Sequence, residues 1–269
     1  MTLKVLSLNI WHDQGPWNER VALLRSWIDR LDPDLIGFQE ILVGEGEDQV
    51  HELVGDRGFH TAYGPAMSLP DRKNLQFGNA IASRWPITDR EEVRLPDRDD
   101  WETRAALMVT IESPHGPIGF SCTHLHWQFN HGHVREKQVA LLAERAWERR
   151  PKNGFPPIIV GDFNAEPDSD EIRFIKGLRS HNGGSVAFLD AWDVAGDSSL
   201  PGEDGLGITW PNRNPYAAVE CEPRRRIDYI FAGLPGRAAP RCPEGTRAPT
   251  ARRVGGRGDC SSTPAARAP

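Results

Sequence analysis

The sequence predicts a mixed α/β domain in which two packed sheets carry helices on the outside. Predicted strands outnumber predicted helices, short turns join several neighbouring strands, and the regular strand–helix alternation of a doubly wound parallel sheet is absent. Neither a G-x-G-x-x-G nor a G-x-x-x-x-G-K-[ST] pattern occurs. With 269 residues, of which 38% are hydrophobic and 26% charged, the chain has a soluble globular composition and enough length to bury a core.

The N-terminal elements follow from apolar spacing. The run VLSLNI within residues 4–11 is too densely apolar for a half-exposed strand, so we expect a buried one. Residues 18–31 have the spacing of an amphipathic helix, which Pro33 ends because a residue before proline is pushed out of helical space. The expected inner face of this helix is Val21, Leu23, Leu24, Trp27, Ile28 and Leu31. DLIGF at 34–38 predicts a second buried strand.

The remaining elements alternate between strands and helices without a fixed period. SPHGP at 113–117 is turn chemistry between two apolar runs and predicts a hairpin. Asp168 is the expected cap of a helix that buries Ile172, Phe174, Ile175 and Leu178. We predict helices at 48–54 and 133–150, and strands at 59–63, 77–83, 103–112, 118–123, 157–160 and 227–231.

Charge divides the chain into two parts. Residues 233–269 contain seven arginines, no lysine and only two acids, a formal charge of +5, whereas residues 1–232 carry −11. The basic part has only Leu234 and Val254 as large aliphatic residues. We therefore predict one domain over 1–232 and a disordered Arg/Ala/Gly/Pro-rich tail over 233–269, whose abrupt change in composition suggests a frameshift in a GC-rich gene.

The composition also indicates where the protein acts. The N-terminus lacks a small-residue cleavage site, and no run approaches the roughly 18 apolar residues of a membrane helix. The four cysteines show no paired spacing, which argues against a disulfide scaffold. We expect a cytoplasmic monomer without a membrane span.

Polar residues recur where apolar strands end. Asn9 follows VLSL, Glu40 follows LIGFQ and His124 follows IGFSCT. Asp162 and Asn164 follow PIIVG, and Asp228 lies within RIDYIF. Strands that end together would gather these groups at one sheet rim. Carboxylates with amides and a histidine form a hard-oxygen environment that favours Mg²⁺ and suits phosphate-ester hydrolysis.

Six motifs occur in a fixed order: LSLNIWH, IGFQE, GNAIASR, THLHW, GDFNAEP and RRIDYIF. In this order they resemble the endonuclease/exonuclease/phosphatase superfamily, over about residues 3–232. The resemblance implies a four-layer sandwich of two packed, mostly antiparallel mixed β-sheets flanked by helices. It also implies a magnesium-dependent phosphoesterase that hydrolyses a phosphodiester or phosphomonoester by in-line attack of water, with Mn²⁺ as an alternative ion.

The same resemblance implies a role for each matching residue. Glu40 would bind the metal directly, and Asn9 would lie beside it. Asp162 would position or deprotonate the attacking water. Asn164 would hydrogen-bond the scissile phosphate, and His124 would stabilise its developing charge. In such enzymes the counterpart of Asp228 orients a histidine near the C-terminus.

Structural interpretations compete with several of these roles. Asn9 could be a turn former, Glu40 a solvated strand end, and Asp162 with Asn164 an Asx turn. Asp228 could form a structural salt bridge with residues 224–226. Asn79 of GNAI could satisfy backbone groups rather than touch substrate. His124, His126, His131 and His133 could bind zinc, although their spacing matches no established zinc pattern.

The superfamily normally closes with a strand carrying Ser-Asp-His, and this sequence has no histidine after His181. The competing hypothesis is therefore a catalytically impaired or dead member that binds a phosphate-bearing ligand. The substrate could be a small organic phosphodiester, a lipid headgroup or nucleic acid. The −11 charge of residues 1–232 argues against tight nonspecific binding of DNA.

Overall fold

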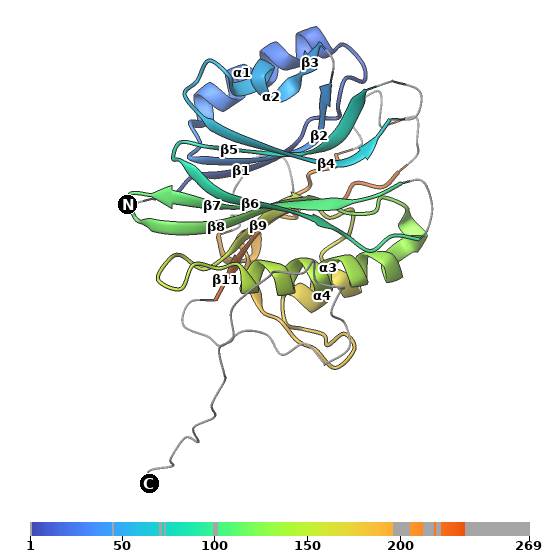
Figure 1. Ribbon diagram of the computed structural model, residues 1–269. Coiled ribbons are helices and arrows are strands. Elements are labelled where there is room, and N and C mark those ends of the chain that lie inside the picture. Colours follow the sequence, from blue (N-terminus) through green and yellow to red (C-terminus); the bar gives the residue numbers. More distant parts are fainter. Residues whose placement is uncertain are drawn as a thin grey trace.

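The computed structural model describes residues 2–44, 46–69, 72, 74–98, 102–195, 205–211, 218 and 222–234. Figure 1 shows four layers, in which two sheets stack face to face, α1 and α2 cover the outer face of one, and α3 and α4 cover the outer face of the other. This arrangement confirms the predicted mixed α/β sandwich. Of the predicted tail, only residues 233 and 234 lie within the described part of the chain.

The first sheet contains one parallel pair. Its strand order is β1-β2-β5-β4, with β3 attached to β2, and only β1 and β2 run parallel. The strands are β1 (Val5–Asn9), β2 (Leu35–Gly44), β3 (Glu47–Asp48), β4 (His60–Ser68) and β5 (Leu75–Ser83). The helices outside it are α1 (Trp17–Leu31) and α2 (Gln49–Val54).

The second sheet repeats this mixed pattern. Its order is β10-β11-β9-β8-β7-β6, and only β8 and β9 run parallel. The strands are β6 (Ile87–Arg94), β7 (Ala105–Ser113), β8 (Gly116–His124), β9 (Ile158–Asp162), β10 (Phe188–Asp190) and β11 (Asp228–Gly233). Outside them lie the 3₁₀ turn η1 (Phe129–His131) and the helices α3 (Gly132–Glu148), α4 (Asp170–Ile175) and α5 (Ala191–Ala195).

Three apolar clusters hold these layers together. One fills the space between the sheets and includes Leu35, Ile81 and Phe120, and another lies under α3 and α4 around Phe163. A third packs α1 and α2 onto the first sheet around Phe38. Full burial of such a side chain contributes about 1.5–3 kcal/mol. The clusters fix the two sheets against each other, and this fixes the relative positions of their strand ends.

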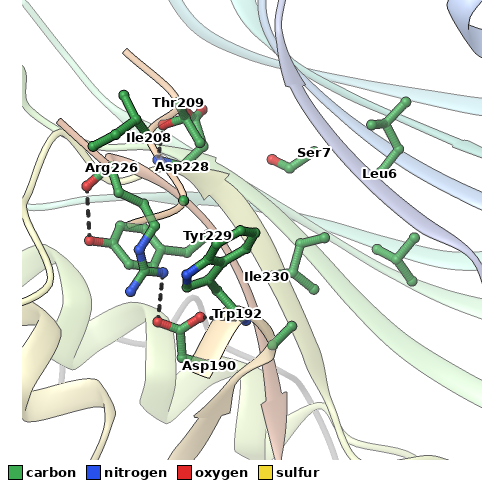
Figure 2. Close-up of a pocket in the computed structure, with 13 residues that line it drawn as sticks. Leu6, Ser7, Asp190, Trp192, Ile208, Thr209, Arg226, Asp228, Tyr229 and Ile230 are labelled. Carbon is green, nitrogen blue, oxygen red and sulfur yellow. Dashed lines mark hydrogen bonds and ion pairs between the residues drawn. The ribbon is translucent and has the colours of Figure 1, made fainter. Parts of the chain in front are cut away.

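β1 is less buried than its sequence predicted. All five of its residues are only partly buried, because among the described strands β1 forms an edge of its sheet. A cavity of about 480 Å³ lies between β1 and β11, with Leu6, Ile230 and Trp192 in its largely apolar wall. Figure 2 shows Asp228 and Thr209 at one end of this cavity.

Other details of the elements also differ from the prediction. Helix α1 buries only Ile28 fully, and the predicted inner residues Leu23, Trp27 and Leu31 are exposed, since a helix packed on a flat sheet hides only a narrow stripe. Leu178 lies beyond the end of α4 and is exposed. The residue before α4 is Ser169 rather than Asp168.

The short or strongly charged strands β3, β6 and β10 were not predicted. Among the described helices, none combines the length and apolar content needed to cross a bilayer.

Candidate active site at the sheet rim

Strand register brings three of the predicted site residues into one row. His124 at the end of β8 pairs with Asp162 at the end of β9, and Asp162 pairs with Asp228 at the start of β11. Residues directly opposite in neighbouring strands project from the same face. The second sheet therefore presents a histidine and two carboxyl groups side by side, facing the first sheet.

Asn9 links this row to the other sheet. Its Nδ2 donates to Glu40 Oε1 at 2.9 Å and to Asp162 Oδ2 at 3.0 Å. Its Oδ1 accepts the backbone N–H of Trp11 at 2.9 Å, which fixes the orientation of the amide. The nitrogen of Asn9 thus faces both carboxylates, and the side chain holds them in register across the gap between the sheets.

Glu40 lies where the pairing of β2 with β5 is irregular. The pairing of β2 with β5 shifts between Phe38 and Ile41, and Glu40 has φ of 60°. A bulge re-aims the side chain of the residue that it contains, and a left-handed non-glycine residue costs about 1–3 kcal/mol. We attribute this conformation to the position of the carboxylate, which regular pairing would not direct at Asn9.

Asp162 and Asn164 form a local turn at the end of β9. Asp162 Oδ1 accepts the backbone N–H of Asn164 at 2.9 Å, and Asn164 Nδ2 donates to the carbonyl of Leu125 at 3.1 Å. The Asx-turn interpretation is therefore correct as geometry, and it also orients the Asp162 carboxylate. A Cβ on the preceding Gly161 would lie 2.1 Å from the carbonyl oxygen of Thr123, so glycine allows β8 and β9 to approach here.

Among the described residues, no cation contributes to the environment of Asp162 or Asp228. Burial raises the pKa of Asp162 well above its usual range, and the charges of Asp228 and Glu40 raise it further. Removal from water, together with the charge of Glu40, raises the pKa of Asp228 to about 6, although a hydrogen bond with Thr209 opposes this. Burial and neighbouring negative charge therefore disfavour the ionised forms of both aspartates.

His124 is buried between these acids. It is 5% exposed, its Nε2 lies 3.8 Å from Asp162 Oδ2, and its Nδ1 lies 4.0 Å from Glu40 Oε1. Burial, with a smaller contribution from the Arg104 charge, holds the pKa of His124 well below its usual range. Nδ1 has no hydrogen-bond partner. The ring is thus neutral and leaves one buried nitrogen unsatisfied.

The donor set fits a hard divalent cation. Glu40 Oε1, Asp162 Oδ2 and Asp228 supply carboxylate oxygens, and a cation among them would offset the burial and the neighbouring negative charge that raise the pKa values of both aspartates. Within the described part of the chain, no three acidic, histidine or cysteine side chains converge closely enough to enclose an ion. Mg²⁺ tolerates this because it commonly takes one or two carboxylates and keeps several waters.

The structure brings all six sequence-predicted site residues to one rim, and it bears on two of the alternatives. Arg226 pairs with Asp190 at 2.8 Å and Arg225 pairs with Glu222, so these arginines bind other acids than Asp228. Asn79 is buried and donates to the carbonyl of Ala105 at 2.8 Å, across the sheet interface. Its contact is therefore with backbone.

Two further residues lie at the rim that the sequence did not predict as site residues. His12 Nε2 lies 3.9 Å from Glu40 Oε2, while Nδ1 is 2.9 Å from Asp13 Oδ1. Thr209 Oγ1 accepts the backbone N–H groups of Ile227 and Asp228 at 3.1 and 3.2 Å. His12 is the last residue of the motif LSLNIWH, so the motif could have indicated it as a site residue. Thr209 comes from a loop in which no motif indicated a site residue.

Among the described residues, the other histidines of this segment contact one another and an arginine. His126 Nε2 hydrogen-bonds His131 Nδ1, and the remaining ring nitrogen of His131 contacts the Arg98 guanidinium. A cationic neighbour on that nitrogen opposes a metal ion. The rings of His126 and His131 stack at 4.6 Å between centroids, and His133 is turned edge-on to the second ring.

The fold and the rim together define a class of protein: a two-sheet α/β sandwich with an acidic, amide-linked rim. The profile of the Endonuclease/Exonuclease/phosphatase family matches residues 6–247, and the chain belongs to that family. The matched range extends beyond residue 232, the predicted end of the domain.

One curated relative and two solved structures illustrate what the chain is similar to. The uncharacterized protein YbhP of Escherichia coli K12 is 30% identical over 181 residues, which cover 61% of this chain and 67% of YbhP. The catalytic domain of human Nocturnin with bound sulfate superimposes with a TM-score of 0.64 at 22% identity, covering 86% of this chain and 81% of that domain. ANGEL2, a 2′,3′-cyclic phosphatase in complex with adenosine-2′,3′-vanadate, gives 0.58 at 18% identity, covering 81% and 75%.

Proposed function

We propose that this protein is a phosphoesterase that uses a divalent metal ion, Mg²⁺ or Mn²⁺, to hydrolyse a phosphodiester or phosphomonoester by in-line attack of water. The observation that carries this proposal is the uncompensated acidic rim at Asn9, Glu40, Asp162 and Asp228. Membership of the family supports the reaction class. A cytoplasmic location and a monomeric state belong to the same proposal.

The proposed chemistry begins at Asp162. A carboxylate whose pKa is raised is a stronger base than an ordinary aspartate, and burial raises the pKa of Asp162 well above its usual range. The backbone N–H of Asn164 and the amide of Asn9 fix both of its oxygens. In the proposal, Asp162 orients the attacking water and accepts its proton.

His124 and Asn164 hold the phosphate. A neutral imidazole donates a hydrogen bond without a change of charge, and the buried, partnerless Nδ1 of His124 is available for it. Asn164 Nδ2 donates one hydrogen to the carbonyl of Leu125, and its second hydrogen can donate to a phosphate oxygen. These donors stabilise charge that develops on the phosphate in the transition state.

Glu40 is the proposed direct metal ligand, and Asn9 positions it. The bound ion would supply Lewis-acid stabilisation of the phosphate oxygens. Asn9 presents nitrogen to the carboxylates, so we assign it to orientation of Glu40 and Asp162, with any contact to the ion through water. Asp228 adds negative charge at the rim.

The competing proposal is a member that binds phosphate esters without turnover. Hydrolysis of bis-p-nitrophenyl phosphate with and without Mg²⁺ separates the two. We expect turnover that disappears with EDTA, and an Asp162→Asn variant that is about 10²–10⁴-fold slower. A folded protein that shows no metal-dependent turnover would support the binder.

The matched control is Asp190→Asn. Asp190 is a buried aspartate that pairs with Arg226 and lies outside the rim. Its substitution should lower stability while kcat changes little in the folded fraction. Equal loss of kcat in both variants would mean that Asp162 acts through folding and not through chemistry.

A further inference from the structure

Two large aromatic side chains stand exposed on the segment that leaves β8. Trp127 is 49% exposed and Phe129 is 53% exposed. Among the described residues, the other large aromatic with comparable exposure is Trp27 on the distant helix α1. Single exposed apolar residues need no explanation, but two that are neighbours at a functional rim suggest a binding surface.

Both rings are held in place before any ligand arrives. Trp127 Nε1 donates to Glu102 Oε2 at 2.8 Å, and the Arg225 guanidinium lies 4.3 Å from the centre of the Phe129 ring. The backbone is fixed as well, because Arg135 donates to the carbonyls of His126, Gln128 and Phe129. A fixed ring loses little conformational freedom on binding, which favours recognition.

The segment that carries the two rings begins at the rim, where β8 ends at His124. Asn164 Nδ2 holds the carbonyl of Leu125, and Trp127 follows two residues later. Trp127 is three positions after His124, so their Cα atoms lie within about 11 Å. Arg225 is likewise three residues from Asp228, which brings the covered face of Phe129 near the other side of the rim.

The charges below the rings are balanced. Arg104 pairs with Glu102, Arg135 with Glu171 and Arg225 with Glu222. Although residues 1–232 carry −11, this part of the surface rests on arginine–glutamate pairs rather than on lone acids. An anionic ligand that reaches the rim across this surface therefore avoids most of the repulsion of the domain.

We propose that Trp127 and Phe129 form a stacking platform for the nucleobase of a single-stranded or mononucleotide phosphoester, and so determine substrate specificity. Every base offers a flat π-face to an aromatic ring, whereas an inositol headgroup offers none. Bases inside a duplex are already stacked and cannot reach the platform. This proposal rests on the proposed hydrolytic function and names its substrate class.

The test compares two esters with the same leaving group: the p-nitrophenyl ester of thymidine 5′-monophosphate and methyl p-nitrophenyl phosphate. Base stacking contributes about 1–3 kcal/mol, or about 5- to 150-fold. We expect Trp127→Leu and Phe129→Leu to lower kcat/KM for the thymidine ester by that factor, mainly through KM. The methyl ester should change less than twofold.

Matched variants complete the design. Trp27→Leu removes an equally exposed tryptophan that also carries an arginine, Arg30, over its ring, and it should change neither substrate. Trp127→Phe keeps a ring and loses the bond to Glu102, so it should retain most of the preference. Equal losses for both esters, or no loss for the thymidine ester, would overturn the platform.

Failure of catalysis can be told apart from failure of the platform. If wild-type protein hydrolyses neither ester, the proposed function fails, and adenosine 5′-monophosphate binding is then measured by calorimetry. Binding that Phe129→Leu weakens at least fivefold and Trp27→Leu leaves unchanged upholds the platform. Absent binding, or binding that Phe129→Leu does not alter, contradicts it.

Discussion

Buried carboxylates occur in this protein in two different settings. Behind the second sheet, Asp190 faces Arg226 at 2.8 Å, and Glu171 faces Arg135. At the rim, Asp162 is just as buried, yet its nearest ionisable partners are a neutral histidine and two further acids. In the first setting an arginine pairs with each buried carboxylate. In the second, no cationic side chain among the described residues pairs with Asp162.

The difference separates structural acids from functional ones. A buried charge without a partner is expensive, so a fold that depends only on stability would pair it or remove it. The rim instead fixes its acids with an amide and with backbone N–H groups, which orient the carboxylates without neutralising them. This is the arrangement expected of a site that awaits a cation and a substrate.

The largest effect should follow from breaking a compensated pair. Arg226→Met leaves Asp190 buried without its cation and should lower the free energy of unfolding by about 3–5 kcal/mol, as measured by urea titration. The double variant Arg226→Met/Asp190→Leu should recover most of this loss. If the single variant unfolds like wild type, the distinction between the two settings is wrong.

The effect of metal comes next. Saturating Mg²⁺ should raise the free energy of unfolding, by about 2.7 kcal/mol when its concentration is 100 times the Kd. Glu40→Gln should abolish this gain, whereas Asp190→Asn should retain it. Thermal denaturation with MgCl₂ and with EDTA measures both. An identical shift in Glu40→Gln would place the ion elsewhere.

The smallest effect should have the opposite sign. Asp228→Asn removes one of the facing charges and should stabilise metal-free protein by about 1 kcal/mol while it lowers turnover. Thermal unfolding in EDTA gives the first quantity and ester hydrolysis the second. Destabilisation by this substitution would mean that the Asp228 charge is compensated after all.

Sequence alone predicted five of the six rim residues because they follow recognisable apolar runs, and Asp228 because it lies within one. It could not predict their contacts. The bulge that turns Glu40 toward Asn9 depends on how β2 pairs with β5, which is a property of two distant segments. Thr209 comes from a loop whose position depends on β11.

The prediction of burial failed for a similar reason. The density of apolar residues predicted a buried β1 and a broad buried face on α1. The neighbouring strands and helices, however, determine how much of each element is covered. β1 has one strand neighbour among the described residues, and α1 hides little beyond Ile28. β6 was missed because most of its residues face solvent and are charged.

The central claim is that the acids of the rim lack compensation within the protein. Carboxyl ¹³C NMR titration of metal-free protein tests it directly, with Asp228→Asn to assign the resonance. The account predicts that Asp228 titrates near pH 6, well above the ordinary aspartate value of 3.8. Titration of Asp228 at or below that ordinary value would contradict it.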